Sequence, residues 1–130
     1  MTATEHTEVT DQLEKAPTGG FVFWFAIYGG IVLWLTHLFI VSSLVRLSCN
    51  THGRTEWAAH AATVVTAALT ALALWLCVRY LREAGDGEDV GTPWGRTRFL
   101  ALFGIISNAV NILLIVAEGA YVFLIRPACG

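Results

Sequence analysis

The sequence has little charge. Only 14% of its 130 residues are Asp, Glu, Lys or Arg, whereas soluble globular domains carry about 25%. The net charge is −2, and no basic stripe is present that could follow a phosphate backbone, so nucleic acid is not expected as a partner. The segment 83–98 contains a GxG, but neither GxxxxGK[ST] nor GxGxxG occurs in the chain. Nucleotides are therefore not expected as ligands either.

Catalytic motifs are also lacking. The sequence shows no nucleophile–base pair and no metal-ligand motif, and its three cysteines have no ligand spacing. We therefore do not expect an enzyme. A secretory signal peptide is not expected either, because residues 1–20 carry one Lys against four carboxylates, whereas a signal peptide begins with a basic region.

Apolar residues are what the chain has in abundance. They make up 55% of it, and the mean hydropathy is +0.61. Three runs, 21–45, about 57–80 and about 99–125, each reach the ~20 residues that a helix needs to cross a bilayer. The sequence predicts an all-α fold, a three-transmembrane-helix bundle at 21–130, preceded by a disordered N-terminal tail at 1–20.

The distribution of basic residues predicts the topology, because Lys and Arg are enriched on the cytoplasmic side. The tail and the second loop share one face of a three-span chain, and the first loop and the C-terminus share the other. The first face holds Lys15, Arg79, Arg82, Arg96 and Arg98, and the second holds Arg46, Arg54 and Arg126. Five against three predicts that the N-terminus lies inside and the C-terminus outside.

The cysteines add a second expectation about the outer face. Cys49 follows the first span and Cys129 follows the third, so both lie on the non-cytoplasmic side, where disulfides persist. We predict a Cys49–Cys129 disulfide, with two unpaired thiols as the alternative. Cys77, near the inner end of the second span, is predicted to be a small packing residue.

Each span contains one ionisable residue that would lie within the membrane: His37, His60 and Glu118. Such residues are functional candidates, because a charge at that depth costs several kcal/mol. Side chains lean toward the N-terminus of their helix, so His37 and Glu118 lean into the membrane and His60 leans outward. We predict a His37–Glu118 contact, with His60 at the outer rim.

Two stripes of small and polar residues are expected to join the second and third spans through interhelical hydrogen bonds. One stripe contains Gly104, Asn108, Asn111 and Glu118, and the other contains His60, Thr63, Ala67 and Thr70. We interpret Asn108, Asn111 and the threonines as structural.

Four interpretations of the ionisable residues remain open. His37 and His60 could ligate haem b, or with Glu118 they could bind copper or zinc. Glu118, Asn111 and Asn108 could form a proton or ion path, although no ionisable residue continues it inward. The fourth is a His–Glu pair that holds the helices in register, with no cofactor, and this is the one we favour.

Three sequence segments resemble one group of proteins. They are WLTHLFIVSSLVRLSC in the first span, RTRFLALFGIISN opening the third, and AEGAYVFLIRPAC near the C-terminus. They are similar to small three-helix membrane proteins encoded beside bacterial haem–copper cytochrome c oxidase genes, with His37, Cys49 and Cys129 carrying the match. The resemblance implies a non-catalytic accessory subunit or assembly factor in the bacterial cytoplasmic membrane, with a larger respiratory complex as its partner. A redox carrier or metallochaperone and a small proton or ion conductor are the alternative functions.

Overall fold

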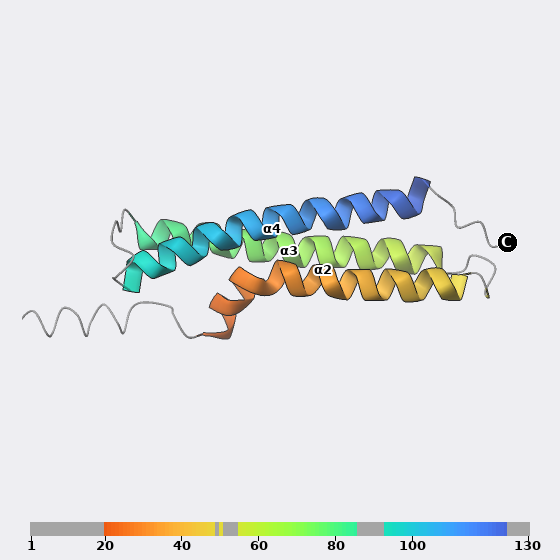
Figure 1. Ribbon diagram of the computed structural model, residues 1–130, viewed down its shortest axis with the longest axis horizontal. Helices are drawn as coiled ribbons and strands as arrows, with labels where there is room; N and C mark the ends of the chain where they lie inside the picture. Colours follow the sequence, from red (N-terminus) through yellow and green to blue (C-terminus); the bar gives the residue numbers. More distant parts are fainter. Residues whose placement is uncertain (1–19, 49, 51–54, 86–92, 125–130) are drawn as a thin grey trace, which may run out of the picture.

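Three long helices form the protein. The computed structural model describes residues 20–48, 50, 55–85 and 93–124, and contains α2 (Phe21–Ser48), α3 (Glu56–Ala84) and α4 (Pro93–Leu124). All three are long and apolar enough to cross a membrane, so the predicted fold class is confirmed. Helices α2 and α4 run in one direction and α3 runs in the other (Figure 1). The predicted tail at 1–20 lies almost wholly outside the described residues, and the N-inside topology stays a prediction.

The helices are longer than the predicted spans. At ~1.5 Å per residue α3 is about 43 Å long, which exceeds the ~30 Å of a hydrocarbon core, so its ends reach the headgroup layers. Helix α4 begins at Pro93 rather than near residue 99. Proline suits a first helical turn because its missing N–H would have no partner there. Arg98 Nη1 donates to the Gly85 carbonyl at 2.6 Å and ties the start of α4 to the end of α3.

Helix α2 bends in its first turns, drawn in orange (Figure 1). At this point the Asn108 side chain from α4 reaches the α2 backbone. Its Oδ1 accepts a hydrogen bond from the Gly30 N–H at 3.0 Å, and its Nδ2 donates to the Ala26 carbonyl at 2.7 Å. A regular α-helix would pair those two backbone groups with each other. A side chain inserted into the helical hydrogen-bond ladder is a known cause of kinks, and we assign the bend to Asn108.

Glycines let α4 approach both of its neighbours closely. A Cβ at Gly104 would lie 2.6 Å from Cys77 Sγ and 3.3 Å from the Ile27 Cα. A Cβ at Gly119 would lie 2.6 Å from Thr63 Cγ2. Small residues of this kind permit tight helix packing in membranes, where apolar burial gives little drive for helices to associate.

The buried face of α3 differs from the predicted stripe. It contains Ala59, Thr66, Thr70, Ala73, Cys77 and Ala84. His60, which was assigned to the stripe, is exposed. Thr66 and Thr70 donate to carbonyls four residues earlier in α3, both at 2.7 Å, so they bond within their own helix rather than across to α4. Local bonding of this type satisfies a hydroxyl without a partner helix.

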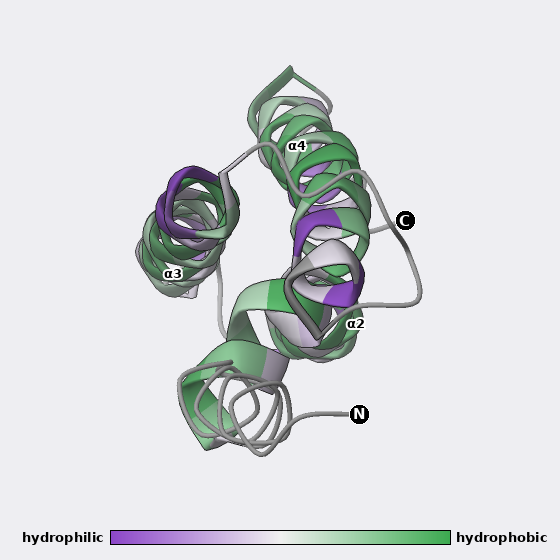
Figure 2. Ribbon diagram, turned by 90° about the vertical axis from the view of Figure 1, so that its left-hand side faces the viewer, coloured by the Kyte–Doolittle hydropathy of each residue, from purple (hydrophilic) through white to green (hydrophobic). Residues whose placement is uncertain are grey.

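The outward surface of the bundle is apolar. In the end-on view, the three helices are hydrophobic over most of their length, with hydrophilic segments at the near ends of α3 and α4 (Figure 2). This pattern is that of a protein whose sides contact lipid or other membrane helices. The aromatic Phe23 is an exception on α2, because it is buried, with its ring centroid 5.3 Å from that of Tyr80.

The predicted disulfide can be tested by counting thiols. Cys49 and Cys129 lie outside the described residues, and within the described part the one cysteine, Cys77, is a free and buried thiol. The ends of α2 and α4 that precede the two outer cysteines lie at the same end of the bundle (Figure 1). We expect denatured, unreduced protein from native membranes to label with maleimide at one thiol, and reduced protein at three. Three labels without reduction would contradict the pairing.

Candidate functional site

His37 connects all three helices. Its side chain lies on α2 and is fully buried. Nδ1 lies 3.1 Å from Glu118 Oε2 on α4, and Nε2 lies 3.0 Å from Thr63 Oγ1 on α3. The predicted contact between His37 and Glu118 is therefore present. Because both ring nitrogens have protein partners, the imidazole is held in one orientation at the junction of the bundle.

Trp34 completes this cluster, and it was not predicted from the sequence. Its Nε1 donates to Glu118 Oε1 at 3.0 Å, so each carboxyl oxygen has one partner from α2. Trp34 precedes His37 by three residues, which places both on one helix face. An indole N–H within a membrane needs an acceptor, and this need is the signal that could have identified Trp34. We call Trp34, His37, Thr63 and Glu118 the His37 cluster.

The hydrogen bonds of Thr63 constrain the protons in the His37 cluster. Its hydroxyl oxygen lies 3.0 Å from the Ala59 carbonyl as well as 3.0 Å from His37 Nε2, yet it has one proton to donate. If Thr63 donates to Ala59, then Nε2 carries a proton, and one more proton is shared between Nδ1 and the Glu118 carboxyl.

The other orientation of the Thr63 hydroxyl implies the other tautomer of His37. If Thr63 donates to His37 Nε2, then Nδ1 carries the proton and donates to Glu118 Oε2. Rotation of one hydroxyl group thus links the tautomer of His37 to a hydrogen bond on α3.

His60 lies apart from the His37 cluster. It is exposed on α3, and its ring centroid lies 6.0 Å from that of Phe123. Haem ligation by His37 and His60 together does not fit this geometry, because one ring points into the bundle and has no free nitrogen while the other lies on the outer surface. In the part of the chain that the structure describes, no three His, Cys, Asp or Glu side chains converge as a metal site would require. The same geometry does not support the copper or zinc interpretation.

The two asparagines occupy different environments. Asn108 is fully buried against the bend of α2, and its Nδ2 also lies 3.6 Å from Cys77 Sγ. Asn111 donates to the Ser107 carbonyl at 2.8 Å, within α4. The asparagine carboxamides are thus bonded to the α2 backbone and within α4, and no hydrogen bond joins either of them to Glu118 among the described residues, so the geometry does not favour the proton path from Glu118 through the asparagines.

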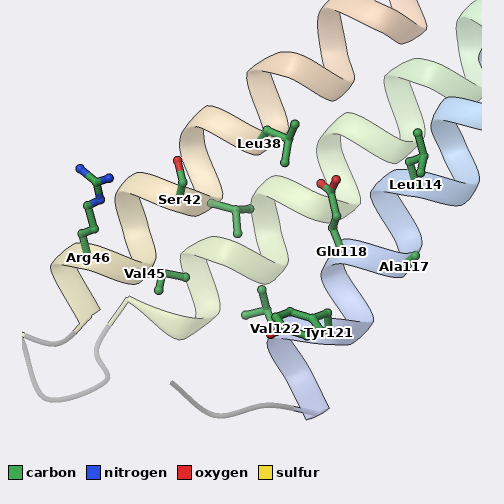
Figure 3. A pocket seen from close by; sticks show the side chains of 10 residues that line it. Leu38, Ser42, Val45, Arg46, Leu114, Ala117, Glu118, Tyr121 and Val122 are labelled. Atoms are coloured by element: carbon green, nitrogen blue, oxygen red, sulfur yellow. The ribbon is translucent and has the colours of Figure 1, made fainter. Parts of the chain in front are cut away.

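A groove opens beside the His37 cluster, between the C-terminal halves of α2 and α4. Its volume is about 580 Å³. The lining residues are Leu38, Val41, Ser42, Val45 and Arg46 from α2, and Leu114, Ala117, Glu118, Tyr121 and Val122 from α4. In Figure 3 the Glu118 carboxyl group extends from α4 toward Leu38, and Arg46 lies at the opposite end of the groove. The Glu118 side chain is 27% exposed, so the groove reaches the His37 cluster.

Comparisons of this chain with protein-family models, with curated proteins and with solved structures found no match.

Proposed function

We propose that this protein is a non-catalytic integral membrane subunit, an accessory or assembly factor of a respiratory complex in the bacterial cytoplasmic membrane. The resemblance of its first and third spans to the small proteins encoded beside haem–copper oxidase genes points to such an oxidase as the partner. Three apolar helices that could cross a membrane are consistent with this role.

The hydrogen bonds of His37 are the observation that supports a structural role most directly. Both nitrogens of His37 and both oxygens of Glu118 are hydrogen-bonded to other side chains of the protein. A ligand site for haem or copper needs a free imidazole nitrogen, whereas a buried hydrogen-bond network between helices holds them in one arrangement. We therefore interpret the His37 cluster as the structural centre of the bundle.

Buried polar side-chain atoms elsewhere in the described core also have hydrogen-bond partners, with one exception. Among the residues that the structure describes, one buried side-chain polar atom lacks a partner, Thr55 Oγ1 at the start of α3. Large apolar side chains face outward on all three helices, including Phe39, Val64 and Leu113. A well-satisfied interior combined with an apolar exterior suits a bundle that packs against the transmembrane helices of a larger complex.

Purification from native membranes tests the proposal. The protein is extracted in a gentle detergent, and one fraction is characterised by mass spectrometry and by its absorbance spectrum. We expect comigration with oxidase subunits, with any haem assigned to those subunits. A lone protein that carries haem or copper would overturn the proposal, and so would a lone protein without any partner subunit.

A further inference from the structure

The groove between α2 and α4 combines an apolar lining with one carboxyl group. Leu38, Val41, Val45, Leu114 and Val122 make most of its wall. Its volume of about 580 Å³ falls within the ~300–1,000 Å³ of small-molecule sites, which are typically apolar with a few polar groups. The volume of the groove and its apolar lining both suit a compact lipid-soluble ligand.

Glu118 determines which polar group the ligand must carry. A carboxyl group has about four lone-pair positions, and two of them are used in the hydrogen bonds with Trp34 and His37. The part of the side chain that is exposed reaches the groove, where an unused acceptor is costly because no water is available in the hydrocarbon region. A ligand that donates a hydrogen bond would satisfy that acceptor.

The aromatic lining narrows the ligand class. Tyr121 follows Glu118 by three residues on α4, so both lie on one face of the helix, and both line the groove (Figure 3). An aromatic ring that donates to Glu118 would lie beside the Tyr121 ring, where aromatic pairs gain energy beyond their buried area. An aliphatic alcohol would make the hydrogen bond but not the ring contact.

We propose that this groove binds a lipid-soluble phenol or hydroquinone, with its hydroxyl group donating to Glu118, its ring beside Tyr121, and its apolar chain along Val41 and Val45 toward the end marked by Arg46. The ring is held at the His37 cluster, and the chain leaves through the open side of the groove. This inference does not rest on the proposed function, because it concerns the isolated bundle and needs no oxidase.

Binding of 2-decyl-1,4-benzohydroquinone tests the inference. The full-length protein is placed in phosphatidylcholine nanodiscs, and equilibrium dialysis under anaerobic conditions measures the bound probe beyond that taken up by empty nanodiscs. We expect saturable binding at about one probe per chain. The 1,4-dimethyl ether of the same compound has the same ring and chain but no donor, and we expect it to bind about tenfold more weakly, as the loss of one membrane hydrogen bond implies.

Substitutions inside and outside the groove test whether the probe binds there. Ala117 lines the groove, and Ala120, on the same helix, is exposed outside it. We expect Ala117→Phe to lower the affinity at least tenfold by filling the groove, and Ala120→Phe to leave it unchanged. Val45→Trp fills the groove from α2 and should reproduce the loss if Ala117→Phe does not fold.

Three results would overturn the inference. Non-saturable uptake equal to that of empty nanodiscs would mean simple partition into lipid. Equal binding of the dimethyl ether would mean that the groove accepts any alkyl chain, such as that of a phospholipid. Unchanged binding in both groove-filling variants would place the site elsewhere.

Discussion

Gly30→Ala is expected to destabilise the protein by about 2 kcal/mol, the cost of overpacking a well-filled core. A Cβ at Gly30 would overlap the Asn108 carboxamide oxygen and would lie 3.2 Å from the Asn108 Cα. The second atom belongs to the α4 backbone and cannot rotate away, so α2 and α4 must separate. The separation would also break the hydrogen bond from the Gly30 N–H to Asn108. Unfolding by SDS titration, followed by circular dichroism, measures the effect.

The neighbouring residue provides a matched control. A Cβ at Gly29 would lie 3.2 Å from two atoms of the Phe25 ring and 3.5 Å from the Ala73 Cβ. The Phe25 ring can turn aside, and replacing Gly by Ala within a helix is intrinsically favourable by up to about 1 kcal/mol. We expect Gly29→Ala to change the free energy of unfolding by less than about 0.5 kcal/mol. Equal losses in the two variants would show that the contact with Asn108 is not what makes Gly30 sensitive.

A double variant isolates the clash from other effects of the extra methyl group. Asn108→Ala removes the carboxamide that a Cβ at Gly30 would meet, at the cost of its bonds to Gly30 and Ala26. Residues in direct contact have non-additive effects on stability. We expect the Gly30→Ala/Asn108→Ala variant to lose less than the sum of the two single losses. Strict additivity would argue against the inserted-side-chain geometry.

The three spans could be predicted from the sequence because hydrophobic length alone determines them. The lean of the side chains predicted that His37 meets Glu118 while His60 does not. Helix ends were harder to predict. Segment 93–98 contains Pro, Gly and two Arg residues, which are typical of a loop, yet α4 begins at Pro93 and includes all of them.

The buried face of α3 could not be predicted because this helix is rich in alanine. The predicted and observed faces share Thr70 and lie beside each other on the helix. Alanines occur on several faces, so hydrophobicity gave no preference between them. The kink of α2 was also beyond prediction. It depends on Gly30 and Asn108, which lie 78 residues apart in the sequence.

His37→Leu is expected to destabilise the protein by about 3 kcal/mol, in the range measured when one member of a buried charged pair is removed. The substitution removes the ring that is hydrogen-bonded to both Glu118 and Thr63. It leaves a carboxyl group with Trp34 as its remaining partner in the His37 cluster. His60→Leu is the control, because His60 is exposed and touches the edge of one ring. We expect it to change stability by less than about 0.5 kcal/mol.

The double variant His37→Leu/Glu118→Leu distinguishes a coupled pair from two independent polar residues. If the cost of His37→Leu arises from an unpaired carboxyl group, then removing that group should restore stability, because an apolar replacement of a whole buried pair is often neutral. We expect the double variant to unfold at a higher SDS fraction than His37→Leu alone. A further loss would mean that Glu118 has a partner more important than His37. The same result in protein treated with a chelator would assign the effect to the helix-joining hydrogen bonds themselves.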